Sequence, residues 1–499
     1  MRLDDIVRRS AARFPTSVAV KGPDETLTYG QLDALANRVA RALLELGVQR
    51  GDRVGLWTEK SARAVAAMQG IARLGAAYVP LDPHSPASRT LRIVEDCGIQ
   101  VVVTSASRAG DLSVEGRAPP RLLLVDDTGP GFAWGQLSAR SAEPVPPHGL
   151  EEDALAYILY TSGSTGTPKG VCISHRNALA FIEWCHALLG TTPEDRFSNH
   201  APFYFDLSVL DLYAAFLGGA SVTLIPEALA FAPRKLVEFV QSERFTVWYS
   251  VPSALILMMR EGGLLEHADL PFRAVLFAGE PFPIKHLRPL REHLPQARCF
   301  NLYGPTETNV CTFHEVKDIA PERTEPVPIG LASCGDRVWL ARAEGEELGE
   351  LMVEGPTVMR GYWGHPPQGD RPYATGDLCR ELPDGAFEYV GRRDSMLKVR
   401  GRRIEPGEIE AALLTHPDVQ AVGVVARGSG LEARLVACVV SPSPRPPSLL
   451  QLKKHCAERL PRYMIVDEVR VLSELPRTQN GKLDRRALTE RVQRPSAED

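Results

Sequence analysis

Short stretches of apolar residues alternate along most of the chain with longer segments in which apolar residues recur every three or four positions. Residues 54–57, 155–160 and 247–250 consist almost entirely of apolar or small side chains, as do strands buried on both faces. In the segment that follows Gly30, leucine, valine and alanine side chains fall on one helical face. Strands that alternate with amphipathic helices predict parallel sheets joined by crossover helices, so we expect an α/β body.

The pattern changes near Val338, where short strand-like runs are separated by tight turns such as Pro383-Asp384-Gly385. Such spacing predicts a small antiparallel subdomain. The chain has 499 residues, which is too long for a single hydrophobic core. We therefore expect a large body and at least one smaller domain.

Composition and charge narrow the class of protein. Hydrophobic residues make up 44% of the chain and charged residues 24%, as in globular domains, and no apolar run reaches the ~18 residues of a membrane-spanning helix. The net charge of −5 argues against a nucleic-acid partner. Nine cysteines occur without a Cys-x-x-Cys pair. That pattern argues against disulfides and structural zinc, and it favours reduced thiols in the cytoplasm.

Residues 160–171 combine hydroxyl groups, glycines and one lysine between two apolar segments. Glycine allows a backbone to approach a ligand closely, and backbone N–H groups, hydroxyls and a lysine together can hold a polyphosphate. The run is not a Walker A loop, because Pro168 precedes Lys169 and neither serine nor threonine follows the lysine. Taken alone, such a run can also be a flexible surface loop.

Further blocks follow in a fixed order. They are residues 205–208 (Phe-Asp-Leu-Ser), 301–307 (Asn-Leu-Tyr-Gly-Pro-Thr-Glu), 373–377 (Tyr-Ala-Thr-Gly-Asp), 391–401 (beginning Gly-Arg-Arg-Asp) and 480–484 (Asn-Gly-Lys-Leu-Asp). Together with residues 160–171 they resemble the adenylate-forming (ANL) superfamily of acyl-CoA synthetases, luciferases and nonribosomal-peptide adenylation domains. The resemblance runs from about Leu27 to the end of the chain. Asp206 and the complete 301–307 block point to the amino-acid-activating branch.

The resemblance implies an α/β fold with two domains. The N-terminal core, residues 1–393, would contain two mixed or parallel sheets with helices and the antiparallel subdomain, and would bind ATP and the amino acid. Residues 394–499 would form a small, mobile α+β lid with its hinge at Asp394. Hinges are a few residues that absorb a large dihedral change. Rotation there would exchange the loop carrying Lys482 for the face at residues 398–401 over one active site, with Lys398 a candidate for the second step.

The resemblance also implies a two-step reaction. A carboxylate attacks the α-phosphate of Mg·ATP to give an acyl-AMP and pyrophosphate, and a thiol then takes the acyl group while AMP leaves. Phosphoryl transfer depends mainly on positioning and charge neutralisation, which suits the residue types in these blocks. The implied ATP-binding residues are Thr161, Ser162, Gly163, Ser164, Thr165, Gly166, Lys169, Gly279, Glu280, Asn301, Tyr303, Gly304, Thr306, Asp377, Arg392 and Lys482.

Three of the residues carried over from the family are implied to be catalytic. Lys169 would hold the departing pyrophosphate, Glu307 would hold Mg²⁺, and Lys482 would bridge the substrate carboxylate and the α-phosphate. Tyr303 would face adenine, and Asp377 would accept the ribose hydroxyls. Taken singly, Asp377 and Lys482 are typical turn residues and Tyr303 is a typical core residue. Their joint occurrence in this order favours the site.

Asp206 is the implied recognition residue for the substrate. A carboxylate in an enclosed pocket needs a cation, and the resemblance assigns it the α-ammonium of an amino acid. The other implied substrate-binding residues are Leu207, Leu210, Tyr249, Leu276, Ala278, Leu302, Val310 and Cys311. They add no second charge, so the pocket suits a small apolar side chain, and their order is similar to the signature of free-standing L-prolyl ligases of pyrrole-forming pathways. Valine, leucine and pipecolate stay open, because one or two methylenes give only about 1–3 kcal/mol of discrimination.

The acceptor thiol is expected on another molecule. No Gly-Gly-x-Ser carrier segment follows Lys482, so the resemblance implies a separate phosphopantetheinylated peptidyl carrier protein, with neither a membrane nor a nucleic acid as partner. A CoA ligase for a small carboxylic acid is the nearest alternative, and Asp206 argues against it. A non-catalytic nucleotide-binding protein is a distant alternative. His175 and His200 are interpreted as structural residues.

Overall fold

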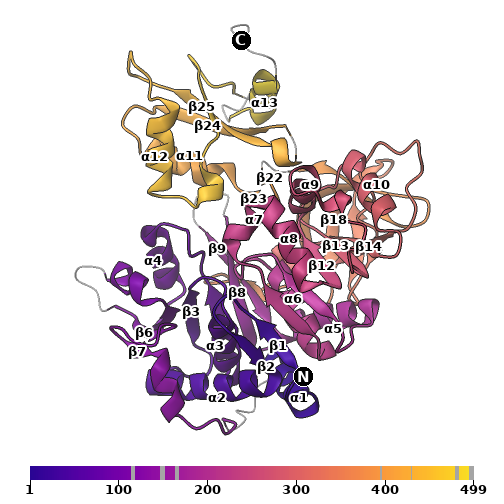
Figure 1. The fold of residues 1–499 in the computed structure, drawn as a ribbon. Coiled ribbons are helices and arrows are strands. Elements are labelled where there is room, and N and C mark those ends of the chain that lie inside the picture. Colours follow the sequence, from indigo (N-terminus) through magenta and orange to yellow (C-terminus); the bar gives the residue numbers. More distant parts are fainter. Residues whose placement is uncertain are drawn as a thin grey trace.

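Two large sheets form the body of the molecule, and a smaller C-terminal domain lies across one end of it (Figure 1). The structure is a computed structural model that describes residues 1–113, 119–145, 152–162, 168–393, 396–428, 430–477 and 483–493. Three groups of predicted functional residues lie outside the described residues: 163–166 of the phosphate loop, the hinge Asp394, and Lys482.

One sheet has nine strands: β1 (Val18–Lys21), β2 (Thr26–Thr28), β10 (Arg196–Asn199), β11 (Ser221–Leu224), β12 (Val247–Ser250), β13 (Ala274–Phe277), β14 (Arg298–Tyr303), β15 (Thr312–Val316) and β16 (Leu331–Ala332). Their order is β16-β15-β14-β13-β12-β10-β11-β1-β2. The strands from β14 to β1 in this order run parallel, and the flanking strands pair antiparallel. The carboxyl ends of β12, β13 and β14 therefore share one edge.

The second sheet has eight strands: β3 (Arg53–Trp57), β4 (Ala77–Pro80), β5 (Val101–Thr104), β6 (Arg121–Leu124), β7 (Phe132–Ala133), β8 (Leu155–Thr161), β9 (Lys169–Ser174) and β19 (Gly361–Tyr362). Their order is β19-β9-β8-β4-β3-β5-β6-β7. β8 and β9 pair antiparallel, with Thr161 opposite Lys169. The two ends of the predicted phosphate loop are thus held by a pair of strands.

Helices fill layers on both sides of each sheet. Between the sheets lie α1 (Leu3–Arg13), α2 (Tyr29–Glu45), α3 (Ala62–Arg73), α5 (His175–Leu189) and α6 (Leu207–Gly218), which share one apolar cluster with strands of both sheets. The outer face of the nine-stranded sheet is covered by α8 (Pro233–Glu243), α9 (Pro252–Arg260) and α10 (Ile284–His293), with α7 (Glu227–Ala230) before them. The outer face of the eight-stranded sheet is covered by α4 (Ala87–Asp96).

The remaining elements form the subdomain and the C-terminal domain. The antiparallel subdomain consists of β17 (Arg337–Ala341), β18 (Leu348–Glu354), β20 (Tyr373–Glu381) and β21 (Phe387–Arg392). The C-terminal domain begins with a hairpin, β22 (Leu397–Val399) and β23 (Arg402–Ile404). It continues with α11 (Pro406–Leu414), β24 (Ala421–Arg427), β25 (Arg434–Val440), α12 (Leu449–Ala457), β26 (Glu468–Val471) and α13 (Arg485–Gln493).

The architecture confirms the predicted fold class. Parallel sheets with crossover helices, an antiparallel subdomain and a small α+β domain occur in the predicted order. The domain boundary at 393/394 stays a prediction. None of the helices in the described ranges combines the length and the apolar character that a bilayer span requires.

The contact between α2 and α3 depends on one glycine. A Cβ at Gly70 would lie 2.6 Å from Cγ1 of Val39 and 3.0 Å from the carbonyl oxygen of Ala36. We expect Gly70→Val to lower the free energy of unfolding by about 1–3 kcal/mol, because the two helices must separate to admit the side chain. Thermal unfolding followed by circular dichroism measures the loss.

Gly110→Ala is the matched control, because a Cβ at Gly110 meets no atom within 4 Å. Its unfolding temperature should stay close to that of the unmodified protein. Equal unfolding temperatures for the two variants would contradict the close α2–α3 packing.

Candidate active site

The ends of three neighbouring strands and the beginning of one helix meet at a cavity of about 90 Å³. Tyr249 lies on β12, Ala278 follows β13, Thr306 follows β14, and Asp206 immediately precedes α6. Parallel strands place their carboxyl ends at one edge of a sheet, where α/β folds bind ligands. Segments far apart in sequence are therefore brought together around one small space.

Asp206 is half-buried and lines this cavity. Burial raises the pKa of its carboxyl to about 6, although a hydrogen bond with Thr306 acts in the opposite direction. Leu207, Ala278 and Val310 line the same cavity with apolar groups. A ligand that brings a cation to Asp206 would stabilise the ionised carboxylate and lower its pKa.

The other predicted pocket residues divide into two groups. Leu210, Leu276 and Leu302 are buried in the apolar cluster that includes Tyr249, but they are not among the lining residues of the cavity. Cys311 packs in a separate cluster with residues of the antiparallel subdomain, and its thiol contacts the backbone oxygen of Tyr303 at 3.6 Å.

Three lining residues fall outside every predicted block and residue set: Phe181 on α5, Asn309 and Arg403. For Phe181 there was only an indirect signal, because it lies on the helix that follows the predicted phosphate loop.

The turn after β14 is fixed by a close backbone approach. A Cβ at Gly304 would lie 1.7 Å from the carbonyl oxygen of Asn309, so only glycine fits there. Asn309 has a φ of 50°, donates to the carbonyl oxygen of Thr357, and accepts a hydrogen bond from the Tyr157 hydroxyl. This anchored turn presents Thr306 to the cavity.

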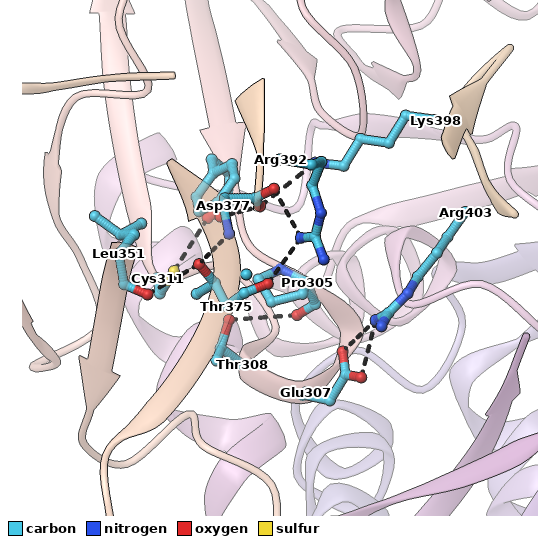
Figure 2. A network of polar contacts seen from close by, with 12 residues as sticks. Pro305, Glu307, Thr308, Cys311, Leu351, Thr375, Asp377, Arg392, Lys398 and Arg403 are labelled. Atoms are coloured by element: carbon cyan, nitrogen blue, oxygen red, sulfur yellow. Dashed lines mark hydrogen bonds and ion pairs between the residues drawn. The ribbon is translucent and has the colours of Figure 1, made fainter. Parts of the chain in front are cut away.

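Asp377 on β20 is buried and surrounded by donors (Figure 2). The Tyr303 hydroxyl donates to it at 2.5 Å and Nη1 of Arg392 donates at 2.8 Å. Nζ of Lys398, on the C-terminal hairpin, lies 3.7 Å from the same carboxylate, and burial lowers the pKa of Lys398. The structure therefore brings together the predicted ribose acceptor, the predicted adenine-facing ring and two cations.

Glu307 is buried and bound by a cation from the C-terminal domain (Figure 2). Nη1 of Arg403 donates to both carboxylate oxygens at 2.9 Å, and the Tyr362 hydroxyl donates to one of them at 2.7 Å. Burial pushes the pKa of Glu307 upward, but Arg403 and Tyr362 outweigh it and hold that pKa below its ordinary value. Neither Arg403 nor Tyr362 was named by the sequence analysis.

The described ends of the phosphate loop lie beside this ion pair. Thr161 ends β8 and Lys169 begins β9. Nζ of Lys169 lies 5.3 Å above the ring of Tyr362, and the Ser162 hydroxyl donates to the backbone oxygen of Arg403 at 3.0 Å. Both ends of the loop thus face the Glu307 side of the cavity.

The predicted residues bordering the base are held by backbone contacts. Glu280 accepts hydrogen bonds from the backbone N–H groups of Ser253 and Gly401, and burial raises its pKa. Gly279 has a φ of 94°, a conformation that favours glycine. Asn301 is buried, and its side chain donates to the carbonyl oxygen of Pro328.

The C-terminal domain is docked with its hairpin over the cavity. Lys398, Gly401 and Arg403 all line the cavity. Arg89 on α4 and Glu408 on α11 form a buried ion pair across the same interface. The face at residues 398–401, which the sequence analysis expected in the second step, is therefore the one that covers the site.

The two histidines interpreted as structural lie away from the cavity lining. His175 is buried and accepts a hydrogen bond from the backbone N–H of Leu3, and burial lowers its pKa to about 4. The ring of His200 lies 5.5 Å from that of Trp248, and burial lowers its pKa to about 3. Both rings are neutral at pH 7.

Comparison with known proteins gives consistent matches along the chain. Residues 7–363 match the family described as AMP-binding enzyme, and residues 408–482 match the AMP-binding enzyme C-terminal domain. An L-proline--[L-prolyl-carrier protein] ligase of Pseudomonas fluorescens is 48% identical over 98% of this chain and 99% of that protein. A protein of the same name from Streptomyces coelicolor is 40% identical over 96% and 95%. The crystal structure of IdnL1 superposes with a TM-score of 0.79 and 30% identity over 95% and 99%.

The raised pKa of Asp206 predicts a pH-dependent effect on stability. The folded protein binds this proton more tightly than the unfolded chain does, so ionisation of Asp206 destabilises the fold above about pH 6 and has no effect well below the ordinary pKa near 4. We expect Asp206→Asn to raise the unfolding temperature of the ligand-free protein at pH 8 by about 2–4 °C, and to leave it unchanged near pH 3.

Asp269→Asn is the control, because the Asp269 side chain is 90% exposed. Its replacement should change the unfolding temperature neither at pH 8 nor at pH 3. A variant at Asp206 that lost stability at pH 8 would mean that the carboxylate already has its cation.

Proposed function

The chain belongs to the AMP-binding enzyme family, and we propose that it activates L-proline as prolyl-AMP and passes the prolyl group to the phosphopantetheine thiol of a separate peptidyl carrier protein. The observation that carries the proposal is Asp206, a carboxylate of raised pKa that lines a small cavity together with the apolar side chains of Leu207, Ala278 and Val310. Support comes from the two relatives that are ligases of L-proline and its carrier by name. Both align with nearly the whole chain.

In the first step, Asp206 binds the α-ammonium of the amino acid. The cavity wall of Leu207, Ala278 and Val310 accepts a small apolar side chain and offers no partner for a second charge. The substrate carboxylate then faces the α-phosphate of ATP, which Lys482 approaches when its loop covers the site. Correct placement of the two reactants supplies much of the rate, because the attack becomes effectively intramolecular.

ATP lies between the phosphate loop and the antiparallel subdomain. Asp377 accepts the ribose hydroxyls, the Tyr303 ring borders adenine, and Lys169 holds the β- and γ-phosphates as pyrophosphate leaves. Phosphoryl transfer spreads charge over the phosphate oxygens, so fixed cations near them stabilise the transition state.

We assign Mg²⁺ to Glu307. Mg²⁺ is usually held by one or two protein carboxylates together with phosphate oxygens, so a single buried carboxylate is a fitting donor. Both oxygens of Glu307 bind Arg403 in the present arrangement. Glu307 would therefore bind either Arg403 or the metal, and not both at once. When bound, Mg²⁺ neutralises charge on the phosphates.

In the second step the C-terminal hairpin covers the adenylate. A second cavity, of about 710 Å³, lies between the start of α10 and the loop at Gly428 and Gly430, and it shares Lys398 with the first cavity. The carrier's thiol reaches the acyl-phosphate through this opening, the acyl–sulfur bond forms, and AMP leaves with the acyl–oxygen bond broken. All nine cysteines are buried free thiols, and we place this chemistry in the cytoplasm.

Amino-acid-dependent pyrophosphate release tests the first step. We expect L-proline to give the highest kcat/KM among proline, pipecolate, valine, leucine, alanine and aromatic amino acids. Asp206→Asn should lower kcat/KM for proline by about 10- to 100-fold, because the α-ammonium loses a charged partner. A preference for another small amino acid would support aminoacyl-AMP formation but contradict L-proline as the substrate. Release that depends only on acids lacking an amino group would favour a CoA ligase.

Separate assays of the two steps test the roles of the two lysines. We expect Lys482→Ala to slow prolyl-AMP formation by about 10²- to 10³-fold, because developing charge on the α-phosphate loses its cation. Transfer from prolyl-AMP supplied in solution should persist. Lys398→Ala should instead slow transfer to the holo-carrier more than it slows adenylation. Equal slowing of both steps by either variant would contradict the alternation of the two faces.

A further inference from the structure

Arg402 lies among three aromatic rings at the junction of the two domains. Its guanidinium carbon is 4.0 Å from the ring centroid of Phe205, 5.3 Å from that of Tyr463 and 5.8 Å from that of Tyr204. Phe205 and Tyr204 belong to the N-terminal body, whereas Tyr463 belongs to the C-terminal domain. All three distances fall within the ~6 Å at which a guanidinium is attracted to an aromatic face.

The three arginines of the hairpin make different contacts. Arg403 binds Glu307, and Arg400 binds Asp467 within its own domain. Nη1 of Arg402 is buried and has no hydrogen-bond partner in the part of the chain that the structure describes. Arg402 also interacts with the Tyr204 side chain by a hydrogen bond. It is therefore held by that contact and by the faces of the rings, on which a planar guanidinium stacks and a lysine ammonium does not.

The ring nearest to Arg402 belongs to the residue that precedes Asp206. Phe205 and Asp206 both line the small cavity, and so does Gly401, the neighbour of Arg402 on the hairpin. The Arg402 side chain thus links the hairpin that covers the cavity to the segment that carries Asp206. This contact exists only while the hairpin lies over the cavity.

We propose that Arg402 is a positioning residue for thioester formation, which seats the C-terminal hairpin by stacking on Phe205. The inference rests on the two-step function proposed above. A contact shifts an equilibrium only if it differs between the two states. Stacking on Phe205 therefore favours the arrangement seen here and contributes nothing while the loop carrying Lys482 covers the site. Loss of Arg402 should slow transfer and spare adenylation.

The test compares both half-reactions in four proteins: the unmodified chain, Arg402→Leu, Arg402→Lys and the control Arg434→Leu. Arg434 is a half-exposed arginine of the C-terminal domain whose ion-pair partner, Asp467, lies in that domain. We expect Arg402→Leu to slow single-turnover transfer of the prolyl group to the holo-carrier by about tenfold, with prolyl-AMP formation within twofold of normal. Arg402→Lys should also slow transfer, because it keeps the charge but not the stacking plane.

Further outcomes separate positioning from general damage. Arg402→Leu should lower the maximal rate of transfer and leave the KM for the carrier unchanged, because Arg402 contacts Phe205 of the N-terminal body and not the carrier. Tyr463→Leu should slow transfer less than Arg402→Leu does, and it should add little when combined with it. A transfer rate equal to that of the unmodified chain, or parallel losses in both half-reactions, would overturn the proposal.

Domain orientation gives a readout that does not depend on the transfer chemistry. All nine native cysteines are buried, so dyes attached at Arg50→Cys and Leu450→Cys, two exposed positions in different domains, report the arrangement by energy transfer. With a non-hydrolysable prolyl-AMP analogue bound, Arg402→Leu should reduce the population in the arrangement described here. An unchanged population would refute the positioning role, whereas failure of the unmodified protein to load a carrier would refute only the proposed function.

Discussion

Buried carboxylates at the centre of the molecule determine how its two domains meet. Glu307 and Asp377 are almost inaccessible to solvent, and an unpaired charge in such a place is strongly unfavourable. Arg392 of the body and Lys398 of the C-terminal domain compensate Asp377, and Arg403 of the C-terminal domain compensates Glu307. The position of that domain is therefore tied to which cations occupy the site. In the proposed function Asp377 accepts the ribose hydroxyls and Glu307 holds Mg²⁺, so a bound nucleotide with its metal would compete with the hairpin's cations for the same carboxylates.

Asp206 differs from these two carboxylates because the protein leaves it poorly compensated. Burial raises its pKa, so its ionised form costs the folded protein some stability. In the proposed function that cost is offset when Asp206 binds the ammonium group of the substrate, while the apolar wall limits the size of the substrate side chain. Two neighbouring residues therefore have different contacts: Phe205 contacts Arg402 of the C-terminal hairpin, and Asp206 lines the cavity.

The fold and much of the site could be predicted, for different reasons. Buried strands such as β12 and β13 are apolar along their length, so their type follows from local pattern. The residues predicted to bind the nucleotide stand in ordered blocks, and the family resemblance predicted that Tyr303, Glu307 and Asp377 lie around one site. The pairing of Arg403 with Glu307 joins positions 96 residues apart, and no local periodicity encodes it. Cys311 follows Val310 directly, yet Val310 lines the cavity whereas Cys311 packs into the cluster of the antiparallel subdomain, a division that follows from the local course of the backbone before β15.

The contact between Arg402 and Phe205 has a consequence for how such pockets can be exchanged. When only the first half-reaction is considered, a segment carrying Phe205 and Asp206 could be exchanged as a self-contained unit that sets substrate preference. The Phe205 ring in this segment, however, contacts Arg402 on a hairpin that lies roughly 200 residues further along the chain. Under the proposed role of Arg402, a graft that replaces Phe205 without the matching hairpin would leave recognition of the new amino acid intact and slow its transfer to the carrier. Exchange of substrate preference through this segment would then require paired changes in two domains.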